Sequence, residues 1–299
     1  MIINLYLFLC YGRINNNIII NINDNKECNN TNNTMKHAIL LLSSYGINYM
    51  NNFLSQFNCD QRFDIYIHID NQTKIDIERQ KTITKSNIKY INHLYKAQKF
   101  SIEMVDIMFE LLRIANKRDN YDYFHYFSDS CYLIRTLDEF YQFFEKNNNK
   151  TFVTYFLENK YLFKKIRFKL YKGTQWMSLH RNIMHRLLDS LNLFNKYKKA
   201  IRKNKIELIG GAPDEFIITH IIIHDICQGE PQKYDVINND LRYIRWKDCK
   251  NVYCPNYLDQ LNVSEEEIKL IKKNNYLVIR KIDYKNFNAI DLVNRLKGE

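Results

Sequence analysis

Two short apolar segments separated by a helical pattern constrain the fold more than any other feature of the sequence. The first runs from Ala38 to Ser44 and ends in small polar residues, and the second runs from Phe63 to Asp70 and ends in a carboxylate. Between them, apolar residues recur at helical spacing from Ile47 to Phe57. This order predicts a βαβ unit, and therefore a parallel sheet that binds ligands at the carboxyl ends of its strands.

The same alternation of strand and helix patterns continues along the rest of the chain. It predicts an α/β fold with a mostly parallel central sheet flanked by helices, in a single domain over residues 37–299. Further strands are expected near 88–91, 121–127, 151–157, 241–246 and 276–279, and further helices near 101–117, 137–144, 179–197 and 213–223.

Residues 1–36 differ in composition from the rest of the chain and are expected to form a low-complexity extension. The stretch from Asn15 to Thr34 is polar and rich in Asn. The apolar run from Ile2 to Cys10 is too short to span a bilayer and lacks a basic segment before it. This run leaves open a weak signal anchor and peripheral membrane association, and the sequence favours a cytoplasmic or membrane-associated location. The seven cysteines contain no CxxC pair, so a disulfide framework is not expected.

The net charge of +11 suits an anionic partner such as a nucleotide diphosphate. No block of Lys and Arg with interleaved aromatic residues stands out, so we expect no nucleic-acid partner. Abundant, solvated Lys residues are the alternative explanation of the charge.

The segment after Gly210–Gly211 contains the strongest candidate for a catalytic group. Pro213, Asp214 and Glu215 precede an apolar run, and Pro followed by acidic residues is typical of the first turn of a helix. Adjacent side chains on a helix point about 100° apart, so one acid can support the helix start while the other faces a cleft. The alternative is that both acids only complement the helix dipole.

Other candidates each have a structural alternative. Asp70 suits a nucleotide contact or a turn cap, and the Arg280–Lys281 pair suits a diphosphate or a solvated patch. Trp176 and Trp246 suit stacking on a sugar face, although core packing is the ordinary role of Trp.

No metal site is predicted. Asn71 and Gln72 follow Asp70, so the Asp-x-Asp pair that holds a divalent cation in many sugar transferases is absent there. His220 and His224 are four residues apart, but the residues between them lack the glutamate of an HExxH site, and we interpret the two as a partly buried pair. Phosphate-binding glycine motifs of kinases and dehydrogenases are also absent.

Taken in order, these segments resemble the core-2/I-branching β-1,6-N-acetylglucosaminyltransferase family, which includes the peptide O-xylosyltransferases. The resemblance runs from about His37 to about Asp283. It is found in seven segments, 37–42, 64–70, 121–128, 173–179, 213–216, 241–246 and 278–283, which read HAILLL, DIYIHID, YDYFHYFS, GTQWMSL, PDEF, LRYIRW and VIRKID.

The resemblance implies a glycosyltransferase A-type fold and an inverting, metal-independent transfer that needs no cofactor. It implies that Glu215 is the base that deprotonates the acceptor hydroxyl. The donor would contact Ser43, Asp70, Arg280 and Lys281. The acceptor would contact Trp246, Glu158 and Trp176.

The sequence departs from the family pattern at three places. Cys131 and Leu133 stand where the family usually has an acid and a Pro, and Ser43–Ser44 stands where a His is common. An Arg expected between Trp246 and Arg280 has no clear match. These departures concern the donor site more than the fold.

The sequence therefore predicts transfer of a sugar, with N-acetylglucosamine favoured, from a UDP-sugar to a hydroxyl of a glycan or glycoconjugate. Transfer of xylose or another sugar on the same scaffold is the alternative among enzymes. A non-catalytic protein that binds glycan or nucleic acid is the alternative outside enzymes. Recognition of a nucleotide diphosphate distinguishes them, because a simple binding module has no use for it.

Overall fold

The computed structural model describes residues 34–43, 52–57, 60–70, 87–92, 101–163, 166–203, 212–246, 256–283 and 285–298. Most of the extension predicted over residues 1–36, and the Gly210–Gly211 pair, lie outside these ranges. Within the described ranges, no helix combines the length and hydropathy needed to cross a bilayer.

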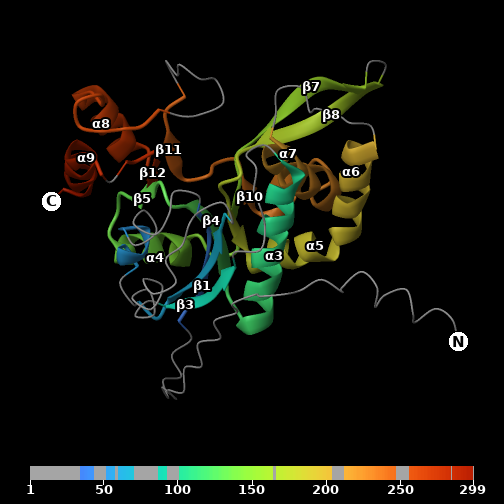
Figure 1. The fold of residues 1–299 in the computed structure, drawn as a ribbon, viewed down its shortest axis with the longest axis horizontal. Helices are drawn as coiled ribbons and strands as arrows, with labels where there is room; N and C mark the ends of the chain where they lie inside the picture. The colour runs from blue at the N-terminus through green and yellow to red at the C-terminus, as the bar shows by residue number, and fades with distance from the viewer. Residues whose placement is uncertain are drawn as a thin grey trace, which may run out of the picture.

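A seven-stranded central sheet organises the fold, with the strand order β10-β6-β9-β4-β1-β2-β3 (Figure 1). The strands β4, β1, β2 and β3 are mutually parallel, and β9 runs antiparallel to its neighbours β4 and β6. Their bounds are β1 His37–Ser43, β2 Phe63–Ile69, β3 Ile88–Asn92, β4 Tyr123–Ser128, β6 Thr151–Phe152, β9 Ser178–His180 and β10 Val236–Ile237.

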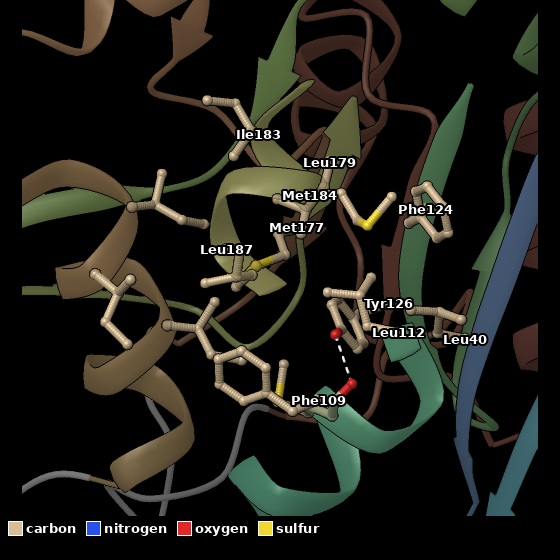
Figure 2. Packing of buried hydrophobic residues seen from close by; sticks show 14 of the residues in the cluster. Leu40, Phe109, Leu112, Phe124, Tyr126, Met177, Leu179, Ile183, Met184 and Leu187 are labelled. Carbon is tan, nitrogen blue, oxygen red and sulfur yellow. Dashed lines mark hydrogen bonds between the residues drawn. The ribbon is translucent and has the colours of Figure 1, made fainter. Parts of the chain in front are cut away.

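Helices cover both faces of this sheet because its central strands are apolar on both sides. In β1, Ala38, Leu40 and Leu42 join one buried cluster, while Ile39 and Leu41 join another. The first cluster lies under helices on one face, and Figure 2 shows its packing. These helices are α3 Ile102–Arg118, α5 Arg181–Asp189, α6 Leu191–Lys203 and α7 Pro213–His220, followed by the π-helix η2 Ile221–Ile226; α4 Leu137–Lys146 packs on the other face.

Two smaller sheets extend the fold. β11 Arg242–Ile244, β12 Val278–Arg280 and β5 Cys131–Leu133 form one, and its apolar residues pack with α8 Glu265–Lys273 and α9 Phe287–Lys297 (Figure 1). The second is a hairpin of β7 Tyr155–Phe163 and β8 Ile166–Gly173, which lies close to α7. Because β5 follows β4 after two residues, the small sheet begins where β4 ends.

The expected mostly parallel α/β architecture is confirmed, with differences at element ends. The helix expected over 179–197 is divided at Ser190 into α5 and α6. The strand expected over 151–157 is divided between β6 and β7, and α7 continues beyond His220 as a π-helix. Short β5, β9 and β10 and the later β8, α8 and α9 were not predicted. The three short strands have too few residues to define a period, whereas the apolar residues of β8 and α9 do recur at strand and helix spacing.

A buried chain of polar side chains links three strands of the central sheet. His37 Nδ1 lies 2.9 Å from His125 Nε2, and His125 Nδ1 lies 2.9 Å from Ser178 Oγ. Burial, with a smaller effect of Arg62, lowers the pKa of His37 to about 3, and burial also holds the pKa of His125 well below its usual range. Both imidazoles are therefore neutral at physiological pH.

These histidines should make the fold sensitive to mild acid. In the unfolded chain they bind protons below about pH 6.5, whereas in the folded chain they do not, so stability is lost as the pH falls below about 6.5. At pH 5 His37 should cost about 2 kcal/mol of the free energy of unfolding relative to pH 7, and His125 adds to the loss. Asp214, whose pKa is raised to about 7, acts in the opposite direction. Urea unfolding at both pH values measures the loss, which should be larger in Asp214→Asn; equal stability at both pH values would contradict it.

Candidate active site

Three parallel strands end close together and bring two of the predicted donor residues into contact. Ser43 ends β1, and Asp70 follows β2, where its backbone N–H donates to the Ser43 carbonyl oxygen at 3.0 Å. The buried Ser43 hydroxyl donates to Asp129 Oδ2 at 2.8 Å. Asp129 follows the last residue of β4, so the Ser43 hydroxyl joins the ends of β1 and β4, and the Asp70 backbone amide joins the end of β2 to them.

Arg280 reaches the same edge from the neighbouring small sheet. Its register places it opposite Cys131, and its Nη1 donates to the hydroxyls of Ser128 and Ser130, the latter at 2.5 Å. The guanidinium carbon lies 4.4 Å from the centre of the Trp176 ring, which is within cation–π range. A positive group is thus held at the end of β4 by two hydroxyls and an aromatic face.

A second guanidinium, that of Arg242, lies near Arg280, and sequence analysis did not identify it. The Arg242 side chain is buried and donates from Nη1 to the Asp240 carbonyl and from Nη2 to the Tyr126 carbonyl, both at 2.7 Å. Its carbon lies 4.8 Å from the Phe127 ring centre. Burial lowers the pKa of Arg242, but a guanidinium is not deprotonated in proteins. Its role could not be predicted from sequence, because an Arg at the start of a short β-like run is common.

Lys281 follows Arg280 and is buried. Its Nζ lies 4.4 Å from the centre of the Tyr257 ring, and its carbonyl accepts a hydrogen bond from the Leu258 amide at 2.9 Å. The aromatic face and the backbone bond fix where Lys281 lies beside the end of β12.

Glu215 lies in the first turn of α7, which begins at Pro213 as the sequence predicted. Its Oε2 lies 3.3 Å from Nζ of Lys172, and the two side chains are 26% and 20% exposed. Lys172 is near the end of β8 and also lies 5.2 Å from the ring centre of Phe216. Glu215 is therefore a carboxylate that solvent reaches and that a fixed cation orients. Sequence reasoning missed Lys172, because the hairpin strand that holds it was not predicted.

The neighbouring acid has a different environment. Asp214 is buried, and burial, together with the charge of Glu215, raises the pKa of Asp214 to about 7. The helix thus buries one acid and exposes its neighbour, in agreement with the angular separation expected from sequence.

A short segment joins the carboxylate to the cationic end of the sheet. Lys172 contacts Glu215 and Trp176 contacts Arg280, and the two contact residues are four positions apart, which is at most about 14 Å of extended chain. Within this segment, Thr174 Oγ1 donates to Asp240 Oδ2 at 2.9 Å. The backbone positions that carry these two contacts are therefore at most about 14 Å apart.

The predicted acceptor residues differ in position. Trp246 follows β11 and is 47% exposed, so its ring is accessible. Trp176 is buried against Arg280, which gives it a structural contact, and its acceptor role stays a prediction. Glu158 lies in β7, and its side chain is outside the described residues.

One group of three potential metal ligands occurs in the described part of the chain. It consists of His220, His224 and Asp225, at the far end of the helix that begins beside Glu215. It contains none of the residues predicted for sugar transfer.

Comparison with known proteins identifies a family that this chain matches. A family model described as Core-2/I-Branching enzyme matches residues 44–272. No match is found among curated proteins. Among solved structures, the apo form of the glycosyltransferase GlyE of Streptococcus pneumoniae TIGR4 is similar, with a TM-score of 0.43 and 11% identity over 84% of this chain and 55% of that chain. The chain thus spans little more than half the length of that structure.

The family match covers most of the chain and confirms the resemblance seen in its sequence segments. The predicted glycosyltransferase A-type α/β fold is also confirmed by the mostly parallel sheet with helices on both faces. The chain belongs to the Core-2/I-Branching enzyme family of glycosyltransferases.

Proposed function

We propose that this protein is an inverting glycosyltransferase that moves a sugar, with N-acetylglucosamine favoured, from a UDP-sugar to a hydroxyl of a glycan, without a metal ion. The main support is a pair of contacts made by the short segment 172–176. Lys172 contacts the accessible Glu215 carboxylate, and Trp176 contacts Arg280 at the cationic strand edge. A base on one side and a cation on the other are the two groups that displacement from a sugar diphosphate requires.

The donor is proposed to lie across the ends of β1, β2 and β4. Asp70 and Ser43 would contact the uridine, since both lie at the switch between strand and loop where nucleotides bind in α/β sheets. Arg280 and Lys281 would hold the diphosphate by charge-assisted hydrogen bonds. Arg242 adds a nearby positive charge that favours an anion at this edge.

Glu215 is proposed to be the general base. The acceptor hydroxyl gives its proton to the carboxylate while its oxygen attacks the anomeric carbon from the face opposite the diphosphate. The bond between the anomeric carbon and the phosphate oxygen breaks, and its electron pair leaves with the diphosphate. One such displacement inverts the anomeric centre, and the cations at Arg280 and Lys281 stabilise the leaving charge. No cofactor is required.

Trp246 is proposed to form part of the acceptor site, because an accessible indole suits the apolar face of a sugar ring. Glu158 and Trp176 are proposed as further acceptor contacts. A donor with another sugar, such as xylose, would use the same base and the same diphosphate contacts, so the donor is best identified by experiment.

A panel of nucleotide-sugars tests the proposal. We expect one UDP-sugar to raise the melting temperature of the full chain, and to be hydrolysed or transferred, with turnover unchanged by EDTA. Loss of turnover in EDTA that manganese restores would contradict the metal-independent mechanism. Stabilisation by a glycan with no response to any nucleotide-sugar would indicate the non-catalytic alternative.

A further inference from the structure

The helix α7, which contains Glu215, changes its winding at its far end. α7 ends at His220 and continues as the π-helix η2 from Ile221 to Ile226, where the Cys227 amide donates to the Ile222 carbonyl five residues earlier, at 2.9 Å. π-turns are rare within helices and are frequent at functional sites. Such a change of winding alters which side chains share one face of the helix.

The π-turn places Asp225 on the same face as His220. In a regular α-helix, residues five apart are about 140° apart around the axis, so Asp225 would point away from His220. A π-helix pairs residues five apart along its axis, so Asp225 and His224 both flank His220. The structure agrees: one ligand atom from each of the three side chains lies within 4.8 Å of the others.

We propose that His220, His224 and Asp225 form a binding site for a divalent transition-metal ion of the zinc class. Two imidazoles and one carboxylate are the donor set that zinc accepts in sites with three protein ligands and a water. Nitrogen donors disfavour Mg²⁺ and Ca²⁺, which prefer oxygen. This site lies outside the groups proposed for sugar transfer.

The ligands are already oriented by neighbouring side chains. The rings of His220 and His224 are stacked with centroids 4.7 Å apart, and His224 Nδ1 lies 3.0 Å from Asp225 Oδ1. The hydroxyl of Tyr197, on α6, donates to Asp225 Oδ2 at 3.2 Å. A partner of this kind fixes a ligating carboxylate and strengthens metal binding. The Tyr197 ring also packs edge-on against His220, at 5.6 Å between centroids.

An ion has a route to the site from solvent. The His224 side chain is 54% exposed, while His220 is buried, so the site opens to solvent on one side. The Tyr171 amide donates to His220 Nδ1 at 3.4 Å, which is near the outer limit for a hydrogen bond. Metal at Nδ1 replaces that contact, and rotation of the ring presents Nε2 instead.

The position of the site indicates a structural role. His220 lies five residues beyond Glu215, about 7 Å further along the helix axis, and the π-turn leads away from the base. An ion bound there would join η2 to α6 through Asp225 and Tyr197. It would thus stabilise the helix without contacting the reacting atoms.

Titration of the full chain with Zn²⁺ alone, and separately with Co²⁺ alone, tests the site after treatment with and removal of EDTA. We expect saturable binding and a melting temperature that rises with Zn²⁺ concentration. Bound Co²⁺ should show visible d–d bands without thiolate charge-transfer bands, because its ligands are nitrogen and oxygen. Absence of saturable binding, or a spectrum dominated by thiolate, overturns the proposal.

Variants locate the binding site. His224→Ala and Asp225→Asn each remove one ligand, and both should weaken Zn²⁺ binding by more than about a hundredfold, since loss of a supporting partner alone costs about 10–100-fold. Tyr197→Phe should weaken it by about 10–100-fold. His185→Ala, at an exposed histidine on α5, is the matched control and should bind as the parent does. Equal Zn²⁺ affinity in the parent, His224→Ala and Asp225→Asn overturns the assignment.

Discussion

Glu215→Gln should fold normally, bind donor nucleotide as the parent does, and lose sugar transfer by about 10²–10⁴-fold. A positioned general base contributes about this factor, and Gln keeps the shape of Glu but accepts no proton. Gln keeps a side-chain oxygen that Lys172 can contact, and both side chains are partly exposed, so the fold should tolerate the change. Initial rates of transfer at saturating donor, with melting temperature as a measure of folding, check this result.

Asp214→Asn is the matched control for this prediction. Asp214 is adjacent in sequence but is buried, with its pKa raised to about 7, so about half of its carboxyl groups are already protonated at pH 7. Removing its charge should therefore change transfer much less than Glu215→Gln does. Transfer lost equally in both variants, or retained in a well-folded Glu215→Gln, would remove Glu215 from the proposed role.

Arg280→Ala should weaken binding of the donor nucleotide by about tenfold or more and slow turnover as well. The guanidinium lies at the strand edge proposed for the diphosphate, and a hydrogen bond to a charged group is worth about 1.5–3 kcal/mol. Lys281→Ala should act in the same direction. Titration with UDP, followed by calorimetry, measures the affinity of each variant.

Two further variants distinguish a specific phosphate contact of Arg280 from an effect of net charge. Arg280→Lys keeps the charge but loses the planar fork that matches a phosphate, so its affinity should fall between those of the parent and Arg280→Ala. Lys233→Ala removes a positive charge from an exposed side chain on a distant turn and should leave UDP affinity unchanged. An affinity that falls equally in Lys233→Ala and Arg280→Ala would show only an effect of net charge.

The sheet was predictable from sequence because its central strands are buried on both faces. The run Ala38–Leu42 is apolar throughout, and Phe63–Ile69 is buried throughout although it contains Asp64 and His68. A parallel strand covered by helices on both sides produces such largely apolar runs. The start of α7 was predictable for a local reason, since Pro213 and the two following acids favour the first turn of a helix.

The contacts that complete the site were not predictable in the same way. Lys172 meets Glu215 only because the β7–β8 hairpin lies close to α7, and residues 43 positions apart in the chain have no shared period. Arg242 and Arg280 reach the end of β4 from the small sheet, whose strands are only three residues long, and Trp176, between β8 and β9, contacts Arg280. The π-turn that places Asp225 beside His220 was also not predictable, because its apolar residues fit a regular helix equally well.

The proposed function depends most directly on whether the chain transfers a sugar with inversion. The decisive measurement is proton NMR of the product formed from a UDP-α-sugar and a glycan acceptor in EDTA, with released UDP quantified in the same reaction. We predict one β-linked sugar on the acceptor for each UDP released, with the rate reduced by about 10²–10⁴-fold in Glu215→Gln. An α-linked product, or tight binding of UDP-sugar with neither product nor UDP release, would contradict the account.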